Sequence, residues 1–237
     1  MTDKITKPVV GVIGAMKEEV EILKQWMDIS KTESIAHTDV YVGTLDSYPI
    51  VLVESGIGKV NATLITSLLI ERYSVELIVN SGVAGALSNK LDVTDMVVST
   101  SVVHHDVDAM EFGYLFGQVP GMPASYEADK KLVDAAIKVL DSNKAVKGFS
   151  GLITSGDSFI ADSNQKSSIL SNFSDALAVD MESASIAQTC HQFNVPFIII
   201  RSISDKADQA ADMTYDEFLK KACINSSEAV KLLLHEM

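Results

Sequence analysis

Cysteine and basic residues are scarce in this sequence. Its 237 residues include only two cysteines, Cys190 and Cys223, too few for a disulfide framework, which favours a reducing compartment such as the cytoplasm. Nineteen lysines and arginines are outnumbered by 32 aspartates and glutamates, and the formal net charge of −13 would repel a nucleic-acid backbone and an anionic membrane surface. We therefore expect a cytoplasmic protein that binds neither nucleic acid nor membrane.

Long apolar runs and familiar cofactor motifs are also missing. No apolar run reaches the roughly 18 residues of a membrane span, and the N-terminus has no secretory signal pattern. The segment Gly56-Ile57-Gly58-Lys59 suggests a phosphate loop, but Val53 and Val60 occupy the positions that need glycine and a hydroxyl residue. Neither the dinucleotide fingerprint nor the Gly-x-Ser-x-Gly motif occurs. The sequence argues against P-loop, nicotinamide-dependent and serine-hydrolase chemistry, and we expect no cofactor.

Apolar strands alternate with amphipathic helices along the chain. Strands are predicted near residues 8–15, 77–80, 96–103, 149–154 and 196–203, and helices near residues 59–73, 129–140, 181–193 and 215–235. Two shorter apolar runs, 40–45 and 50–53, are typical of an antiparallel hairpin. This pattern predicts an α/β fold, a three-layer αβα sandwich with a central mixed, largely parallel sheet. We predict a single domain over residues 1–237, with residues 1–8 as a short N-terminal extension.

Residues 106–127 form a long glycine- and proline-containing loop, which we expect to cover a site or an interface. The run His104-His105-Asp106-Val107-Asp108 at its start offers four metal-capable side chains. Because neighbours on an extended segment point to opposite faces, we favour a hydrogen-bonded loop anchor over a metal site. Cys190, on an apolar helical stripe, is expected to be a core residue rather than a nucleophile.

Three acidic side chains stand where a predicted strand meets the next element: Glu19, Glu182 and Asp205. Glu19 follows Glu18 at a helix start, where the helix dipole stabilises a carboxylate, so a purely structural role remains open for it. In open α/β sheets, ligands bind outside the carboxyl ends of the strands. We therefore expect the three carboxylates to converge on one crevice.

Five motifs in register carry a family resemblance. They are Val12-Ile13-Gly14-Ala15-Met16-Lys17-Glu18-Glu19, Ser55-Gly56-Ile57-Gly58-Lys59-Val60, Ser155-Gly156-Asp157-Ser158-Phe159-Ile160, Met181-Glu182 and Arg201-Ser202-Ile203-Ser204-Asp205. In this order, from about Val10 to the C-terminal helix, the chain resembles bacterial 5′-methylthioadenosine/S-adenosylhomocysteine nucleosidases of the purine nucleoside phosphorylase-like superfamily. The resemblance implies a nucleoside phosphorylase/hydrolase-like fold. It also implies hydrolysis of the N-glycosidic bond of 5′-methylthioadenosine, S-adenosylhomocysteine and 5′-deoxyadenosine, in methionine salvage.

The resemblance also implies catalytic roles, which suit a reaction that passes through an oxocarbenium-like state. Asp205 would protonate N7 of adenine, with Ser204 orienting it. Glu19 would orient and deprotonate the attacking water, with Arg201 in the surrounding hydrogen-bond network. Glu182 would accept hydrogen bonds from the ribose hydroxyls and favour positive charge on the sugar. No metal is implied.

The substrate-binding residues implied by the resemblance divide among base, sugar and 5′ substituent. Phe159 would stack on adenine, the backbone of Ile160 would bind its Watson–Crick edge, and Met181 would lie beneath the ribose. Met16, Ile57 and Tyr215 would form the slot for the 5′ substituent, and the remaining implied substrate contacts are Val83, Ala84, Gly85 and Val179. Phe112 and Pro120 would reach the pocket of a neighbouring subunit, which implies a homodimer.

Some positions depart from the family pattern, and two other functions stay open. Val83 stands where serine is common, Asp180 replaces a glutamate, and Tyr215 replaces a phenylalanine. A phosphorylase would place phosphate beside Glu19, where repulsion between unit charges is of order 4 kcal/mol at ~4 Å and a dielectric constant of about 20. A non-catalytic nucleoside-binding protein would be expected to lack an acid or a base, yet all three carboxylates are present.

Overall fold

The computed structural model of the chain describes residues 7–142, 146–208 and 211–237. Most of the expected N-terminal extension therefore lies outside the described residues. The helices are α1 (Lys17–Trp26), α2 (Lys59–Tyr73), the 3₁₀ helix η1 (Met110–Phe112), α3 (Lys130–Ser142), α4 (Ser163–Asn172), α5 (Ser183–Phe193) and α6 (Ala211–Glu236). The strands are β1 (Val10–Gly14), β2 (Asp28–Ile35), β3 (Thr38–Leu45), β4 (Tyr48–Glu54), β5 (Leu77–Ala86), β6 (Met96–His104), β7 (Tyr126–Glu127), β8 (Gly148–Ser155), β9 (Ala178–Asp180) and β10 (Phe197–Asp205).

The strands form one mixed sheet. Parallel pairs β4–β1, β1–β5 and β5–β10 run through its centre, and the predicted hairpin appears as β3–β4, extended by β2. The sheet also closes on itself, because β5 pairs with both β10 and β9 while β6 and β8 complete the ring between them. The mixed α/β fold is confirmed, and the ring adds a closure that apolar periodicity does not predict. The closure brings the carboxyl ends of β5, β8, β9 and β10 around a common centre.

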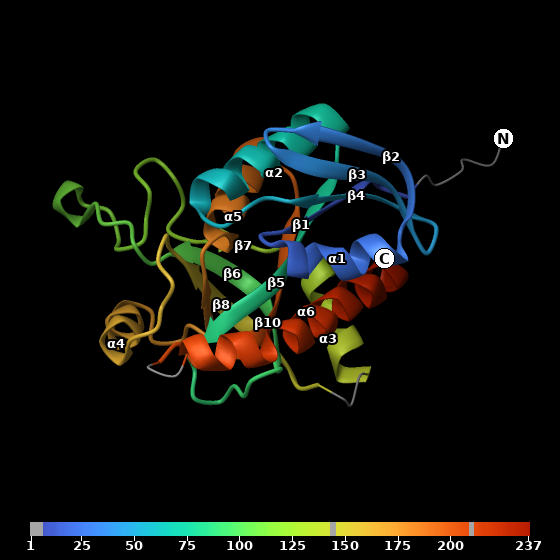
Figure 1. The fold of residues 1–237 in the computed structure, drawn as a ribbon. Coiled ribbons are helices and arrows are strands. Elements are labelled where there is room, and N and C mark those ends of the chain that lie inside the picture. The colour runs from blue at the N-terminus through green and yellow to red at the C-terminus, as the bar shows by residue number, and fades with distance from the viewer. Residues whose placement is uncertain (1–6, 143–145, 209–210) are drawn as a thin grey trace.

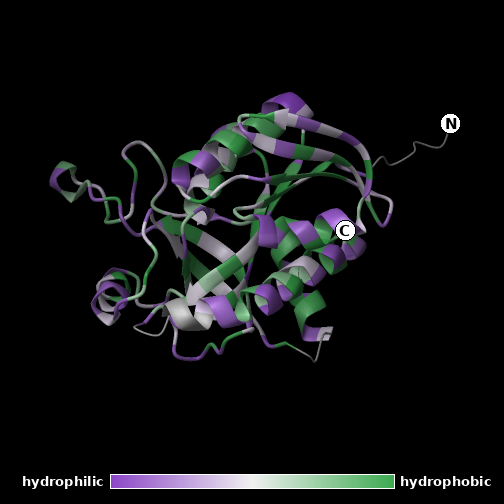
Figure 2. Ribbon diagram, viewed as in Figure 1, coloured by the Kyte–Doolittle hydropathy of each residue, from purple (hydrophilic) through white to green (hydrophobic). Residues whose placement is uncertain are grey.

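Two apolar clusters cover the two faces of the sheet, and strand alternation assigns residues to each. Val10 and Val12 of β1 pack with α1, α3 and α6, whereas Ile13 packs with α2 and α5. Figure 1 shows these two groups of helices on opposite sides of the strands. In Figure 2 hydrophobic residues concentrate on the central strands and on the helix sides that face them. This period of two is what a strand buried on both faces requires.

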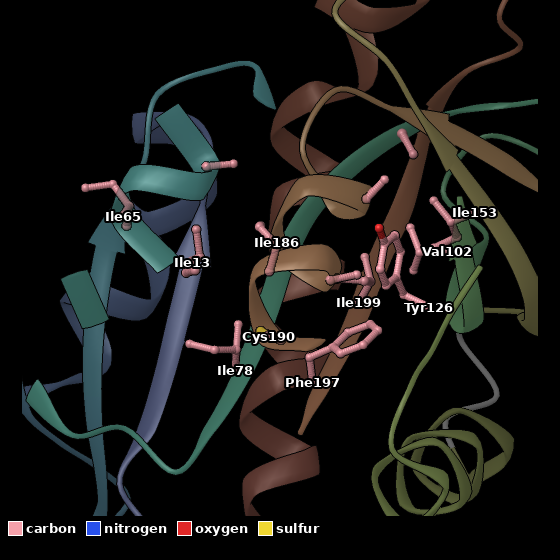
Figure 3. Close-up of a cluster of buried hydrophobic side chains, with 14 of the residues drawn as sticks. Ile13, Ile65, Ile78, Val102, Tyr126, Ile153, Ile186, Cys190, Phe197 and Ile199 are labelled. Carbon is pink, nitrogen blue, oxygen red and sulfur yellow. The ribbon is translucent and has the colours of Figure 1, made fainter. Parts of the chain in front are cut away.

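Cys190 is a core residue, as predicted. It is fully buried on α5 within the cluster that contains Ile13, Ile78 and Ile186 (Figure 3). Burial raises the pKa of its thiol well above the ordinary range, which disfavours the nucleophilic thiolate.

Several elements and boundaries differ from the sequence prediction. The short η1 and β7 lie in the segment predicted as a loop, and β5 and α6 are longer than predicted. Strand β2 and helix α4 were not predicted, because β2 is largely exposed and polar and α4 buries only Ile169. The helix predicted from residue 181 begins at Ser183, with Glu182 as its N-cap residue. None of the helices in the described part of the chain combines the length and apolar character needed to cross a bilayer.

Replacing Ile13 by alanine tests the two-faced core. Ile13 is fully buried, so Ile13→Ala is expected to lower the free energy of unfolding by about 2–5 kcal/mol, measured by urea denaturation. Ile29→Ala is the matched control, because Ile29 lies on β2 and is 39% exposed. Its loss should be less than half as large, and equal losses would contradict the assignment of Ile13 to the core.

Candidate active site

Three buried carboxylates from distant parts of the chain line one cavity. Glu19 lies in the first turn of α1, Glu182 caps α5, and Asp205 ends β10, and each is at most 5% exposed. All three line a cavity of about 530 Å³ at the carboxyl ends of the strands, a volume typical of small-molecule sites. The same local feature brings all three carboxylates to the cavity: each residue ends a strand or lies at the start of the helix that follows one.

The Glu19 carboxylate is held by backbone donors. Its Oε2 accepts hydrogen bonds from the N–H groups of Ala15 (2.5 Å) and Met16 (3.1 Å), and its Oε1 accepts one from Val83 (2.9 Å). Burial raises the pKa of Glu19, while the Arg201 guanidinium and these three N–H groups oppose the rise. Backbone donors cannot rotate away, so the carboxylate has a fixed orientation toward the cavity.

Asp205 is held in a different way. Its Oδ1 accepts the N–H of Ala207 (2.8 Å), and its Oδ2 accepts the hydroxyl of Ser204 (2.8 Å). Burial raises the pKa of Asp205, against the opposing effect of these two hydrogen bonds. A carboxyl group with a raised pKa in a dehydrated cavity can hold and deliver a proton.

Glu182 belongs to a buried network centred on Arg201 and Asp180. Arg201 is fully buried, and its Nε and Nη2 each lie 2.7 Å from Asp180 Oδ2. Arg201 Nη2 lies 3.7 Å from Glu182 Oε2, and Glu182 Oε1 accepts the N–H of Gly58 (2.8 Å). Burial and the neighbouring Asp180 carboxylate raise the pKa of Glu182, and Arg201 opposes them.

Gly82 allows the side chains of Arg201 and Glu19 to approach each other. A Cβ atom at Gly82 would lie 2.2 Å from Arg201 Nη1 and 2.3 Å from Glu19 Oε1. These two atoms therefore lie on the same side of the β5 backbone. Arg201 Nη1 is buried with no hydrogen-bond partner among the described residues, so it is a donor aimed at the Glu19 carboxylate region.

The cavity walls are mostly apolar. Tyr215 of α6 donates a hydrogen bond to Met16 Sδ (3.1 Å), and its ring meets Phe159 edge to face, with centroids 5.8 Å apart. Phe159 is 45% exposed and Ile57 is 50% exposed, so both stand at the open side. The other lining residues expected from the sequence are Val83, Ala84, Gly85, Ile160, Val179, Met181 and Ser204.

Three expected site residues do not line this cavity. Arg201 lies behind its wall, joined to Asp180. Phe112, at the end of η1, is 82% exposed, and Pro120 is exposed in the same loop, and neither lines the cavity of its own chain.

Four cavity-lining residues were not expected from the sequence: Ala15, Ser158, Asp180 and Asp216. Each is adjacent to, or two positions from, a residue that was expected. Direct adjacency in sequence to an expected residue was the signal that could have found them. Asp180 is the most informative, because its ion pair with Arg201 depends on β9 and β10 being brought together.

The predicted loop anchor is present at Asp106. Its carboxylate accepts hydrogen bonds from Lys59 Nζ (2.7 and 2.8 Å) and from the N–H of Asp157 (3.1 Å), which joins the start of α2 to the loop after β8. His104 instead pairs with Gln188 (2.9 Å). Within residues 7–142, 146–208 and 211–237, no three metal-capable side chains are gathered as a metal site would require.

Adding a methyl group at Gly82 tests the close approach. Gly82→Ala is expected to lower the free energy of unfolding by about 1–3 kcal/mol, because Cβ would collide with buried charged groups that cannot move away. Gly151→Ala is the control, since its Cβ would meet only the side chain of Leu177, at 2.7 Å. Thermal unfolding should show the larger loss for Gly82→Ala, and the reverse order would refute the crowding of Arg201 against Glu19.

Comparison with known proteins gives matches over nearly the whole chain. A family model described as the phosphorylase superfamily matches residues 9–237. The chain is 47% identical over 228 residues to 5′-methylthioadenosine/S-adenosylhomocysteine nucleosidase of Staphylococcus epidermidis, covering 96% of this chain and 100% of that relative. It is 49% identical over 221 residues to the protein of the same name from Exiguobacterium sp., covering 93% and 95%.

Solved structures agree as well. The nucleosidase of Neisseria meningitidis in complex with methylthio-immucillin-A superposes with a TM-score of 0.95 at 42% identity, covering 97% of this chain and 100% of that one. The nucleosidase of Colwellia psychrerythraea in complex with adenine has the same TM-score and identity, covering 97% and 96%. Because sequence and structure agree over nearly their full lengths, the chain belongs to the 5′-methylthioadenosine/S-adenosylhomocysteine nucleosidases of the phosphorylase superfamily.

Proposed function

We propose that this protein hydrolyses the N-glycosidic bond of 5′-methylthioadenosine and S-adenosylhomocysteine, and also of 5′-deoxyadenosine, releasing adenine and the corresponding 5-substituted ribose. The relatives' names and the adenine-containing complex of the Colwellia psychrerythraea structure support the reaction class. The observation that carries the proposal for this chain is that Glu19, Glu182 and Asp205 line one cavity. We further propose that the reaction takes place in the cytoplasm, in methionine salvage.

Asp205 acts as the general acid on the leaving group. As the C1′–N9 bond breaks, its electron pair passes to adenine, and protonated Asp205 donates its proton to N7. The burial that raises the pKa of Asp205 supports this role, because the acid must keep its proton until the base departs. Ser204, hydrogen-bonded to Oδ2, orients the carboxyl group.

Glu19 acts as the base for the attacking water. It takes one proton from the water, whose oxygen forms the new bond to C1′ as positive charge develops on the sugar. Three backbone donors hold the ionised form of Glu19 in place. Val83 contributes one of these N–H groups, so its backbone serves the site although its side chain has no polar atom. Arg201 Nη1, beside Glu19 at Gly82, belongs to the polar network behind Glu19 that surrounds the water site.

Glu182 binds the sugar. Gly58 donates to Oε1 of its carboxylate and Arg201 lies 3.7 Å from Oε2, and the remaining lone pairs of the two oxygens are free to accept hydrogen bonds from the ribose hydroxyls. A carboxylate at this position also favours positive charge on the ribose in the transition state. Met181 provides an apolar floor, and the segment Val83–Gly85 with Val179 supplies the surrounding wall.

Apolar side chains bind the two ends of the substrate. Phe159 stacks on adenine and the backbone of Ile160 binds its hydrogen-bonding edge, while Met16, Ile57 and Tyr215 enclose the 5′ substituent. Their common position on the cavity wall supports this division. A thioether is apolar and polarisable, and it suits a slot that contains the sulfur of Met16.

A homodimer completes the pocket. Exposed apolar side chains lie at the start of α2 and around η1: Ile57, Val60, Leu64, Met110, Phe112 and Leu115. Such a group of exposed apolar side chains is typical of a protein interface. We propose that Phe112 and Pro120 of each subunit approach the 5′ slot of the other.

Phosphate independence tests hydrolysis against phosphorolysis. Purified protein is expected to release adenine and free 5-methylthioribose from 5′-methylthioadenosine in phosphate-free buffer, at a rate that added phosphate does not increase. The physical reason is that an ionised Glu19 repels a phosphate dianion by about 4 kcal/mol per unit of phosphate charge, at ~4 Å and an effective dielectric constant of about 20. A requirement for phosphate, with a sugar 1-phosphate as product, would favour the phosphorylase instead.

Removing the acidic proton tests Asp205. Asp205→Asn is expected to lower kcat about 10²–10⁴-fold for 5′-methylthioadenosine, followed by adenine release, because the amide keeps the shape but cannot act as the acid. Asp134→Asn, at an exposed position on α3, should retain wild-type kcat. A fully active Asp205→Asn variant would rule out the acid assignment.

A further inference from the structure

A lysine of helix α4 donates hydrogen bonds to the backbone on both sides of the general acid Asp205. Lys166 lies on α4, and its Nζ donates hydrogen bonds to the carbonyl oxygens of Ala86 (2.8 Å) and Lys206 (2.7 Å). Ala86 ends β5, and Lys206 directly follows Asp205 at the end of β10. One ammonium group thus joins α4 to the ends of two neighbouring parallel strands.

The turn that follows Asp205 is held by the Lys166 ammonium group. Ala207 donates its N–H to Asp205 Oδ1 (2.8 Å), and it does so with φ of +49°, in the left-handed region that disfavours residues with a side chain. Lys206, whose carbonyl Lys166 holds, forms the peptide bond that carries this N–H. A strained peptide persists only where its surroundings hold it, and the Lys166 ammonium is such a restraint.

The second carbonyl belongs to the residue that follows Gly85, and Gly85 packs against the acid. Gly85 precedes Ala86, and a Cβ atom at Gly85 would lie 2.9 Å from Asp205 Oδ1 and 3.1 Å from Ala207 Cβ. The end of β5 is therefore in contact with the Asp205–Ala207 turn. By binding both Ala86 and Lys206, Lys166 fixes the separation of the two backbone segments between which the Asp205 carboxyl group lies.

We propose that Lys166 is a positioning residue for the general acid: it clamps the carbonyls of Ala86 and Lys206, and so keeps the Ala207 N–H on Asp205 and the carboxyl group aimed at the leaving base. The proposal rests on the proposed function, since it assigns Asp205 the acid role. The clamp reaches Asp205 through the backbone, and Lys166 is absent from the cavity lining.

The charges around Lys166 determine in which direction its removal shifts the pKa of Asp205. Lys166 interacts with the carboxylates of Asp205 and Asp208 and with the ammonium of Lys206, and burial lowers its own pKa. Asp205 is influenced by Ser204, Ala207, Asp208 and Lys166, and both the Ala207 N–H and the Lys166 charge lower its pKa. Losing Lys166 removes the charge and loosens the N–H contact, so both changes raise the pKa of Asp205.

Kinetics of three variants test the clamp. Lys166→Met is expected to lower kcat for 5′-methylthioadenosine about tenfold with KM changed less than threefold, because Glu182 and Phe159 still bind the substrate. The high-pH limb of its pH–kcat profile should move to higher pH, since Asp205 must be protonated to act and its pKa has risen. Lys166→Arg keeps the charge and the two donors and should restore both kcat and the limb. Lys131→Met, at an exposed position on α3, is the control and should match wild type.

A direct titration separates this inference from the proposed function. The ¹³C resonance of the Asp205 carboxyl group, identified by its absence in Asp205→Asn, should titrate at higher pH in Lys166→Met than in wild type, whether or not the protein turns over substrate. Near-wild-type thermal unfolding would show that the variant is folded, and Lys166→Gln provides a second neutral variant. An unmoved resonance and limb in folded Lys166→Met, or a wild-type kcat, would overturn the clamp. A wild-type protein that releases no adenine would instead overturn the proposed function.

Discussion

The buried ion pair between Arg201 and Asp180 is the interaction on which the site depends. Arg201 is fully buried. Asp180 Oδ2 accepts from Arg201 Nε and Nη2, and Asp180 Oδ1 accepts the hydroxyl of Ser155 (2.5 Å). The pair links β9 to β10 and places Arg201 between Glu19 and Glu182. Removing one partner of a buried pair leaves an uncompensated charge, at about 3–5 kcal/mol, so the two partners must be present together.

Burial both positions the three carboxylates and tunes their chemistry. Desolvation raises the pKa values of Glu19, Glu182 and Asp205 alike. Their hydrogen-bond partners then distinguish them. Three backbone donors and the Arg201 charge oppose the rise at Glu19, whereas one N–H, one hydroxyl and the Lys166 charge oppose it at Asp205. The same dry cavity can therefore hold a base and an acid within one active site.

Apolar periodicity and strand ends were enough to predict much of the fold and the positions of the acids. The alternation around Ile13 and the hairpin of β3 and β4 follow directly from buried positions repeating every second residue. Helix α4 has no such pattern, because it buries little beyond Ile169. The sequence analysis missed α4 for that reason. It therefore also missed the hydrogen bonds from Lys166 of this helix to the carbonyls of Ala86 and Lys206. Strand β2 escaped prediction on similar grounds, since its residues are mostly exposed.

By itself the sequence determined the α/β class and the positions of the main strands and helices, because these depend on local periodicity. It also placed Asp205 at the end of a strand and Glu19 at the start of the helix that follows one. Only the tertiary structure decided that β9 and β10 both pair with β5. That ring closure brings Asp180 to Arg201 and leaves the Arg201 Nη1 beside Glu19. The physical reason is that long-range pairing depends on how whole faces pack together, and no short stretch of sequence encodes which distant strand will be its neighbour.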